Sequence, residues 1–118
     1  MNKDEIKRRT KKFALDVIRL AEGLPPNYEG QVLGRQLLRS ATSVGANYRA
    51  ACRAKSVADF IAKMGIVEEE ADECIYWMEL LTEAKILPLD KLQTLMTEAD
   101  ELVAITVSSI KTAKANRK

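Results

Sequence analysis

Residues 56–81, SVADFIAKMGIVEEEADECIYWMELL, carry the pattern that decides the fold. Apolar or small side chains recur there at alternating steps of four and three residues, which places them along one side of a helix. These positions are Phe60, Met64, Val67, Ala71, Cys74, Met78 and Leu81. Ser56 before the stripe suits the free amides of a first helical turn, and Asp59 favours the positive helix end. The stretch therefore predicts one long amphipathic helix that stops near Leu87 and Pro88.

Three further segments repeat this stripe, so the sequence predicts four helices. The first covers about residues 4–23 and ends at Gly23, Pro25 and Pro26, where a helix cannot easily continue. The three stripes are Ile6, Thr10, Phe13, Val17 and Leu20; Gly34, Leu37, Ala41, Val44, Tyr48 and Ala51; and Leu92, Met96, Ala99, Val103, Thr106, Ile110 and Ala113. Small residues of the second segment, with Gly45 beside them, predict the close approach of a neighbouring helix. We expect the lysine-rich end, KTAKANRK, to fray.

Length and composition support an all-α fold. The chain has 118 residues, of which 47% are hydrophobic, and only five glycines and three prolines interrupt it. Such a chain is long enough for one core and too short for a second, so we expect a single domain over residues 1–118. Four helices joined by short links predict an antiparallel up-down-up-down four-helix bundle.

The charges are segregated along the chain, although the net charge is only +2. Residues 1–55 hold twelve basic against five acidic side chains, whereas residues 56–89 hold two against eight. This separation has two interpretations: the basic and acidic helices attract one another within the bundle or between subunits, or the basic helices form a surface for nucleic acid. The candidate phosphate-binding residues are Lys7, Arg8, Lys11, Lys12, Arg19, Arg35, Arg39, Arg49 and Arg53.

Few residues suit catalysis. The chain has no histidine, which removes the commonest general base and the histidine ligands of di-iron bundles. Cys52 and Cys74 are too few for a disulfide framework, and we expect both to be reduced in a cytoplasmic protein with no membrane segment. Glu69, Glu70 and Glu73 are close in sequence, but we expect them on a solvated or interface face. We therefore expect no enzyme activity, no catalytic residue, no metal site and no cofactor.

Two smaller groups suggest contacts between helices or subunits. Ser43 and Asn47 lie one turn apart beside the second stripe, where a polar side chain needs a hydrogen-bond partner, so we expect them to fix helix register. A ligand-facing polar patch is the alternative. The third helix also carries large apolar residues outside its stripe, which predict a subunit interface. These are Ile66, Tyr76, Trp77 and Leu80.

Residues 37–81 also carry a recognisable set of motifs. The set comprises Arg39, the run ATSVGAN at 41–47, the pair Asp59-Phe60, and Glu70, Glu73, Tyr76 and Trp77. With these motifs the chain resembles the four-helix bundle family named after the 23S ribosomal RNA intervening sequences in which some bacterial members are encoded. It departs from many members at Gly45, where they have proline, and at Ala50, where they have an acidic residue.

The resemblance implies a ring-like homopentamer. It also implies kinship with the accessory variability determinant protein of diversity-generating retroelements, which binds nucleic acid and a reverse transcriptase. The sequence leaves two hypotheses: a homo-oligomer that associates with RNA or DNA through its first two helices, or a protein-interaction scaffold for a partner such as a reverse transcriptase. Phosphate binding would weaken steeply with salt, which separates the two.

Overall fold

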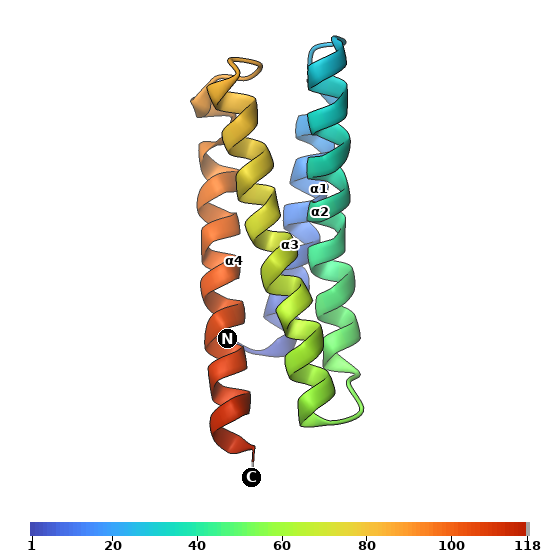
Figure 1. Cartoon of the computed structure of the whole chain (residues 1–118), viewed down its shortest axis with the longest axis vertical. Helices are drawn as coiled ribbons and strands as arrows, with labels where there is room; N and C mark the ends of the chain where they lie inside the picture. The colour runs from blue at the N-terminus through green and yellow to red at the C-terminus, as the bar shows by residue number, and fades with distance from the viewer. Residues whose placement is uncertain (118) are drawn as a thin grey trace.

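The computed structural model describes residues 1–117, which form four helices in an up-down-up-down bundle (Figure 1). The helices are α1 (Lys3–Glu22), α2 (Tyr28–Cys52), α3 (Val57–Glu83) and α4 (Leu89–Asn116). The α1–α2 and α3–α4 links lie at one end of the bundle, and the α2–α3 link and both termini lie toward the other. The bundle measures 51 × 20 × 19 Å. The predicted all-α fold is confirmed.

Side-chain caps begin the first three helices. Asn2 accepts from the amide of Glu5, whose carboxylate accepts in turn from the Asn2 amide, a reciprocal pair that satisfies two free donors. The Ser56 hydroxyl accepts from the amide of Asp59 at the start of α3, as the sequence predicts. The pKa of Asp59 lies below its usual value, chiefly because Lys63 donates a hydrogen bond to its carboxylate and, to a smaller extent, because the Lys55 amide does so.

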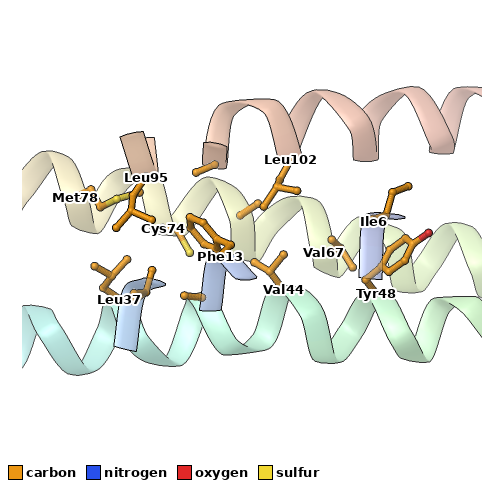
Figure 2. Packing of buried hydrophobic residues seen from close by; sticks show 14 of the residues in the cluster. Ile6, Phe13, Leu37, Val44, Tyr48, Val67, Cys74, Met78, Leu95 and Leu102 are labelled. Atoms are coloured by element: carbon orange, nitrogen blue, oxygen red, sulfur yellow. The ribbon is translucent and has the colours of Figure 1, made fainter. Parts of the chain in front are cut away.

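The predicted stripes of α1, α2 and α3 form the core (Figure 2). Every stripe position of these helices is buried except Leu20 and Phe60, which are half-buried and pack against the core. The largest fully buried side chains include Phe13, Leu37 and Met78. Burial of such side chains contributes about 1.5–3 kcal/mol each and is the main force that holds the helices together.

The predicted stripe of α4 is partly wrong. Leu92, Ala99 and Thr106 are buried as expected, but the positions between them are Leu95 and Leu102 in place of Met96 and Val103. Met96 and Val103 are only partly buried, as are Ile110 and Ala113. Apolar residues stand side by side at 95–96 and 102–103, so the sequence allows two stripes, and packing against α3 selects the leucines.

The carboxyl-terminal segment also differs from expectation. We expected residues 111–118 to fray, but α4 continues to Asn116, so this expectation is wrong for residues 111–116. Lys118 lies outside the described residues. Across residues 1–117, none of the helices combines the length and hydrophobicity needed to cross a membrane.

The helices pair chiefly with their neighbours in sequence. α2 packs on α3, α3 on α4 and α1 on α2, whereas α1 meets α4 over a much shorter stretch. Gly45 lets α1 come close to α2, because a Cβ at this position would lie 3.3 Å from the Thr10 Oγ1 atom. The expected close approach at Gly45 is thus present. Gly34 makes room for the Leu24 side chain from the α1–α2 link instead of a helix.

Candidate nucleic-acid interface

A groove runs between α1 and α2 on the outside of the bundle. Its volume is about 470 Å³, and basic side chains from both helices surround it. Lys7, Arg8 and Lys11 come from α1, and Arg49 comes from α2. These four belong to the nine basic residues that the sequence suggested for phosphate binding, and the fold brings them together because the end of α2 lies beside the start of α1.

Small residues line the groove between the basic side chains. Ala14, Gly45 and Ala46 line it with Thr10 and Thr42. The close approach of α1 at Gly45 leaves little bulk between the two helices, so the basic side chains stand around a hollow. The groove therefore presents both cationic groups and aliphatic surface to a ligand.

The four cations are not neutralised within the bundle. Among residues 1–117, no acidic side chain lies within ion-pair distance of any of them, and no acidic residue lines the groove. Arg8, Lys11 and Arg49 are exposed, and Lys7 is half-buried. Unpaired cations around a concave surface concentrate positive potential there, which attracts anions.

The other basic candidates lie elsewhere. Lys12 pairs with Asp16 at 2.6 Å, and Arg19 lies 3.9 Å from the same carboxylate. Arg35 lines a small cavity of about 160 Å³ farther along the α1–α2 seam, and Arg53 follows the last turn of α2. They do not join the four-residue cluster.

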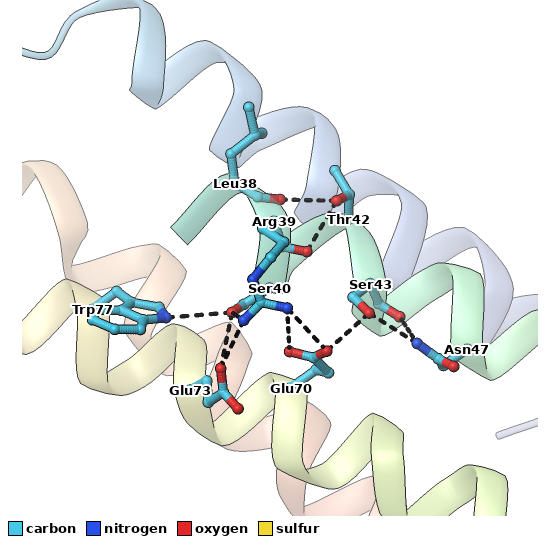
Figure 3. A network of polar contacts seen from close by, with 9 residues as sticks. All are labelled: Leu38, Arg39, Ser40, Thr42, Ser43, Asn47, Glu70, Glu73 and Trp77. Carbon is cyan, nitrogen blue, oxygen red and sulfur yellow. Dashed lines mark hydrogen bonds and ion pairs between the residues drawn. The ribbon is translucent and has the colours of Figure 1, made fainter. Parts of the chain in front are cut away.

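Arg39 belongs to a polar network between α2 and α3 (Figure 3). Its guanidinium contacts the Glu70 carboxylate at 3.3 Å and donates to Glu73 at 2.9 Å. Attraction to Glu70, with hydrogen bonds to both carboxylates, raises the pKa of Arg39. Two carboxylates outweigh one guanidinium, so this surface repels phosphate, which argues against the nucleic-acid role suggested for Arg39.

Ser40 is the buried centre of this network. Its hydroxyl accepts from Arg39 and from the Trp77 indole at 3.3 Å, and it lies 3.4 Å from a Glu73 oxygen to which it donates. The sequence reading did not single out Ser40, although its position one residue before the stripe member Ala41 already places it near the core.

Ser43 and Asn47, which we expect to fix helix register, lie one turn apart on α2. The Ser43 hydroxyl donates to Glu70 on α3 at 3.0 Å, whereas the Asn47 amide donates to the Ser43 carbonyl and hydroxyl, both at 2.9 Å. Ser43 therefore reaches the neighbouring helix directly, and Asn47 acts on it only through Ser43.

The apolar candidates on α3 differ in exposure. Tyr76 is 53% exposed and Ile66 is 42% exposed, whereas Leu80 and Trp77 are half-buried. The Tyr76 and Trp77 rings meet edge to face with their centroids 5.1 Å apart. Trp77 also packs against the core, so Ile66 and Tyr76 are the two of these four candidates that the bundle leaves exposed.

An ion-pair clamp joins α1 to α4, and the sequence reading missed it. Arg9 donates to Glu98 through Nε at 2.9 Å and through Nη2 at 2.6 Å, and Nη2 also donates to Glu101 at 2.8 Å. These hydrogen bonds raise the pKa of Arg9. The partners are 89 and 92 positions away in sequence, so only the register of the two helices reveals them.

The cysteines show no feature of a reactive site. Cys74 is fully buried in the core, and this burial, together with the charges of Glu70 and Glu73, raises the pKa of its thiol to about 12. Both cysteines are free thiols, and Cys52 is half-buried. Among the described residues, no three histidine, cysteine or carboxylate side chains gather as a metal site would require.

Comparison with known proteins agrees with this architecture. A family model described as 23S rRNA-intervening sequence protein matches residues 2–108. The chain is also similar to a crystal structure of a protein of unknown function from the S23 ribosomal protein family of Bacteroides thetaiotaomicron, with a TM-score of 0.87 and 34% sequence identity over 94% of this chain and 99% of that one. No curated protein matches.

Proposed function

Because the chain belongs to the 23S rRNA-intervening sequence protein family, we propose that it binds the phosphate backbone of a nucleic acid in the groove between α1 and α2. The observation that carries this proposal is the cluster of four cations, unpaired among the described residues, around a groove without acidic lining. The family name contributes only an association with ribosomal RNA. The proposed role is binding, without chemistry on the ligand.

Electrostatics set what this groove recognises. Lysine and arginine side chains contact phosphate oxygens whatever the base sequence, so they provide affinity with little base readout. No aromatic side chain is found among the described residues that line the groove, which leaves the bases without a stacking partner. We expect weak binding per subunit that tolerates changes of sequence and falls steeply with salt.

The test is a salt titration of binding to a labelled oligonucleotide, followed by fluorescence anisotropy. Three or four phosphate contacts give a slope of log K against log salt of roughly −2 to −4. In the double variant Lys7→Gln/Arg49→Gln the slope should become shallower by roughly 2. Affinity at 50 mM salt should fall roughly tenfold for each contact removed.

A matched control separates the groove from overall charge. Lys91 and Lys111 on α4 are both exposed and have no ion-pair partner among residues 1–117. The variant Lys91→Gln/Lys111→Gln changes the net charge by the same amount and should bind almost as the parent does. If both double variants lose the same affinity, the groove is not the binding site. If the parent shows no salt-dependent binding, the protein-scaffold alternative is favoured.

A second proposal concerns self-assembly, which would repeat the groove in each subunit. The exposed Tyr76 and Ile66 on α3 support an interface there, because large apolar side chains are more frequent at subunit contacts than on open surfaces. Light scattering should then give several times the 13.2 kDa of one chain, with a pentamer as the expected ring. Tyr76→Ser should lower this mass, whereas Leu15→Ser, at a 45% exposed leucine on α1, a helix that does not pack on α3, should not.

A monomeric mass for the parent would reject this second proposal. An unchanged mass in Tyr76→Ser would remove Tyr76 from the interface. Neither result bears on the groove itself, since phosphate binding by one subunit does not require assembly.

A further inference from the structure

The groove has a size and a set of polar groups that point to one kind of nucleic acid. Within α1 its basic residues span only positions 7–11, about 6 Å along the helix at 1.5 Å per residue. One turn further on, Leu15 and Ile18 are 45% and 39% exposed, and the basic residues beside them, Lys12 and Arg19, face Asp16. The cluster of unpaired cations is therefore short, and beyond it α1 presents apolar side chains and paired charges.

A short hollow suits a flexible strand better than a duplex. Duplex DNA is stiff over about 50 nm, so it cannot fold its backbone into a hollow of this size and would touch only the rim. A single strand can bend a phosphate and its sugar into the groove, with the cations on the phosphate oxygens. The methyl groups of Ala14 and Ala46 and the backbone of Gly45, which line the groove, would then lie against the carbon face of the sugar.

The two hydroxyl groups of the groove, on Thr10 and Thr42, differ in exposure. Thr42 is exposed on the α2 side, and its hydroxyl donates to the carbonyls of Leu38 at 2.9 Å and Arg39 at 3.1 Å. Its hydrogen is thus committed, and its oxygen keeps a free acceptor site. Thr10 donates to the Lys7 carbonyl in the same way, but its side chain is buried.

All other polar side chains that line the groove are lysines and arginines, which only donate. Thr42 is therefore the exposed side-chain acceptor of the described lining. A ribose differs from a deoxyribose by a 2′-hydroxyl, which needs an acceptor when it leaves water. An acceptor beside a cluster of phosphate-binding cations is what such a sugar requires.

We infer that the groove binds single-stranded RNA, with the cations on its phosphates and the Thr42 hydroxyl accepting a hydrogen bond from a ribose 2′-hydroxyl. This inference rests on the proposed function and names the substrate class of the same groove. Thr42 is its specificity-determining residue.

The experiment compares three labelled ligands of one sequence in the same buffer: single-stranded RNA, single-stranded DNA and an RNA duplex. The parent protein should bind the RNA strand about three- to tenfold more tightly than the DNA strand, as one hydrogen bond provides. It should bind the duplex more weakly than either strand. Thr42→Val, which keeps the branched shape, should bring the two strands to equal affinity, and Thr42→Ser should restore the RNA preference.

Each other result is informative. Equal affinity of the parent for RNA and DNA strands, a preference for the duplex, or an unchanged ratio in Thr42→Val would overturn the inference. In those cases the proposed function still stands if Lys7→Gln/Arg49→Gln weakens binding to every ligand. No binding to any of the three ligands would overturn both. Because Thr42 is exposed, a thermal melt should show that both Thr42 variants fold as the parent does.

Discussion

The ion pair between Arg9 on α1 and Glu98 on α4 should contribute more to the free energy of unfolding than any other surface ion pair of the bundle. The guanidinium makes two parallel hydrogen bonds to Glu98, and both side chains are only 27% exposed. Charge-assisted hydrogen bonds contribute about 1.5–3 kcal/mol each when sheltered, and partial exposure reduces this. We expect a coupling free energy of about 1–2 kcal/mol between Arg9 and Glu98.

A double-mutant cycle measures this coupling. Arg9→Met keeps most of the aliphatic stem, and Glu98→Gln keeps the shape of the carboxylate, so the cycle isolates the charged contact. The free energy of unfolding of all four proteins would be measured by urea denaturation at 0.1 M and 1 M NaCl. The coupling should fall at high salt, because the screening length shrinks to about 3 Å.

The Lys12–Asp16 pair on α1 is the matched comparison. It has the same 2.6 Å contact distance, but Lys12 is 76% exposed and both residues belong to one helix. Its cycle, with Lys12→Met and Asp16→Asn, should give only about 0.3–0.5 kcal/mol. If the Arg9–Glu98 coupling is no larger than this, the seam does not depend on the clamp and our reasoning is wrong.

Three further tests address the core, the acid side of the stability curve and the glycines. A thiol reagent at pH 8 should modify Cys52 and spare Cys74, whose burial keeps it protonated, until urea unfolds the chain; equal modification rates would contradict this. The lowered pKa of Asp59 means that its contribution to stability is present above about pH 4 and is lost as pH falls through the folded-state pKa, so Asp59→Asn should flatten the loss of stability between pH 5 and 2 in urea titrations. Gly65→Ala should raise the free energy of unfolding by about 0.5–1 kcal/mol, because nothing lies within 4 Å of the added Cβ. Gly30→Ala should lower it, because its Cβ would lie 2.8 and 2.9 Å from two oxygens, and a gain at this position would refute the geometry of the α1–α2 turn.

Hydrophobic periodicity predicted the fold because the bundle uses one continuous stripe on each helix. It failed where α4 offers adjacent apolar residues, as at Leu95 and Met96, since the choice depends on how α4 is rotated against α3. It failed again at the carboxyl terminus, where lysines suggested fraying but the segment 111–116 remains helical. Both errors arise because packing between helices cannot be read from the spacing of residues along one helix.

The candidate groove was only partly predictable. Lys7 and Lys11 are one turn apart, so a helical projection already places them on one face, and the antiparallel turn brings Arg49 beside them. The opposite charges of α2 and α3 suggest that some arginine of α2 pairs with α3. They do not show that Arg39 is the one that pairs with Glu70 and Glu73, because the register of the two helices decides this. Pairings across the bundle require the three-dimensional arrangement.

The short α1–α4 seam has a consequence for the order of folding. Helices that are neighbours in sequence can pair early, because the loops that must close between them are short. The contact between Arg9 and Glu98 spans 89 positions, and it adds little stability until the other three helix pairs have formed. We expect it to be absent from the folding transition state, so that Arg9→Met accelerates unfolding and leaves the folding rate almost unchanged. The last contact to form would then control how long each folded molecule survives.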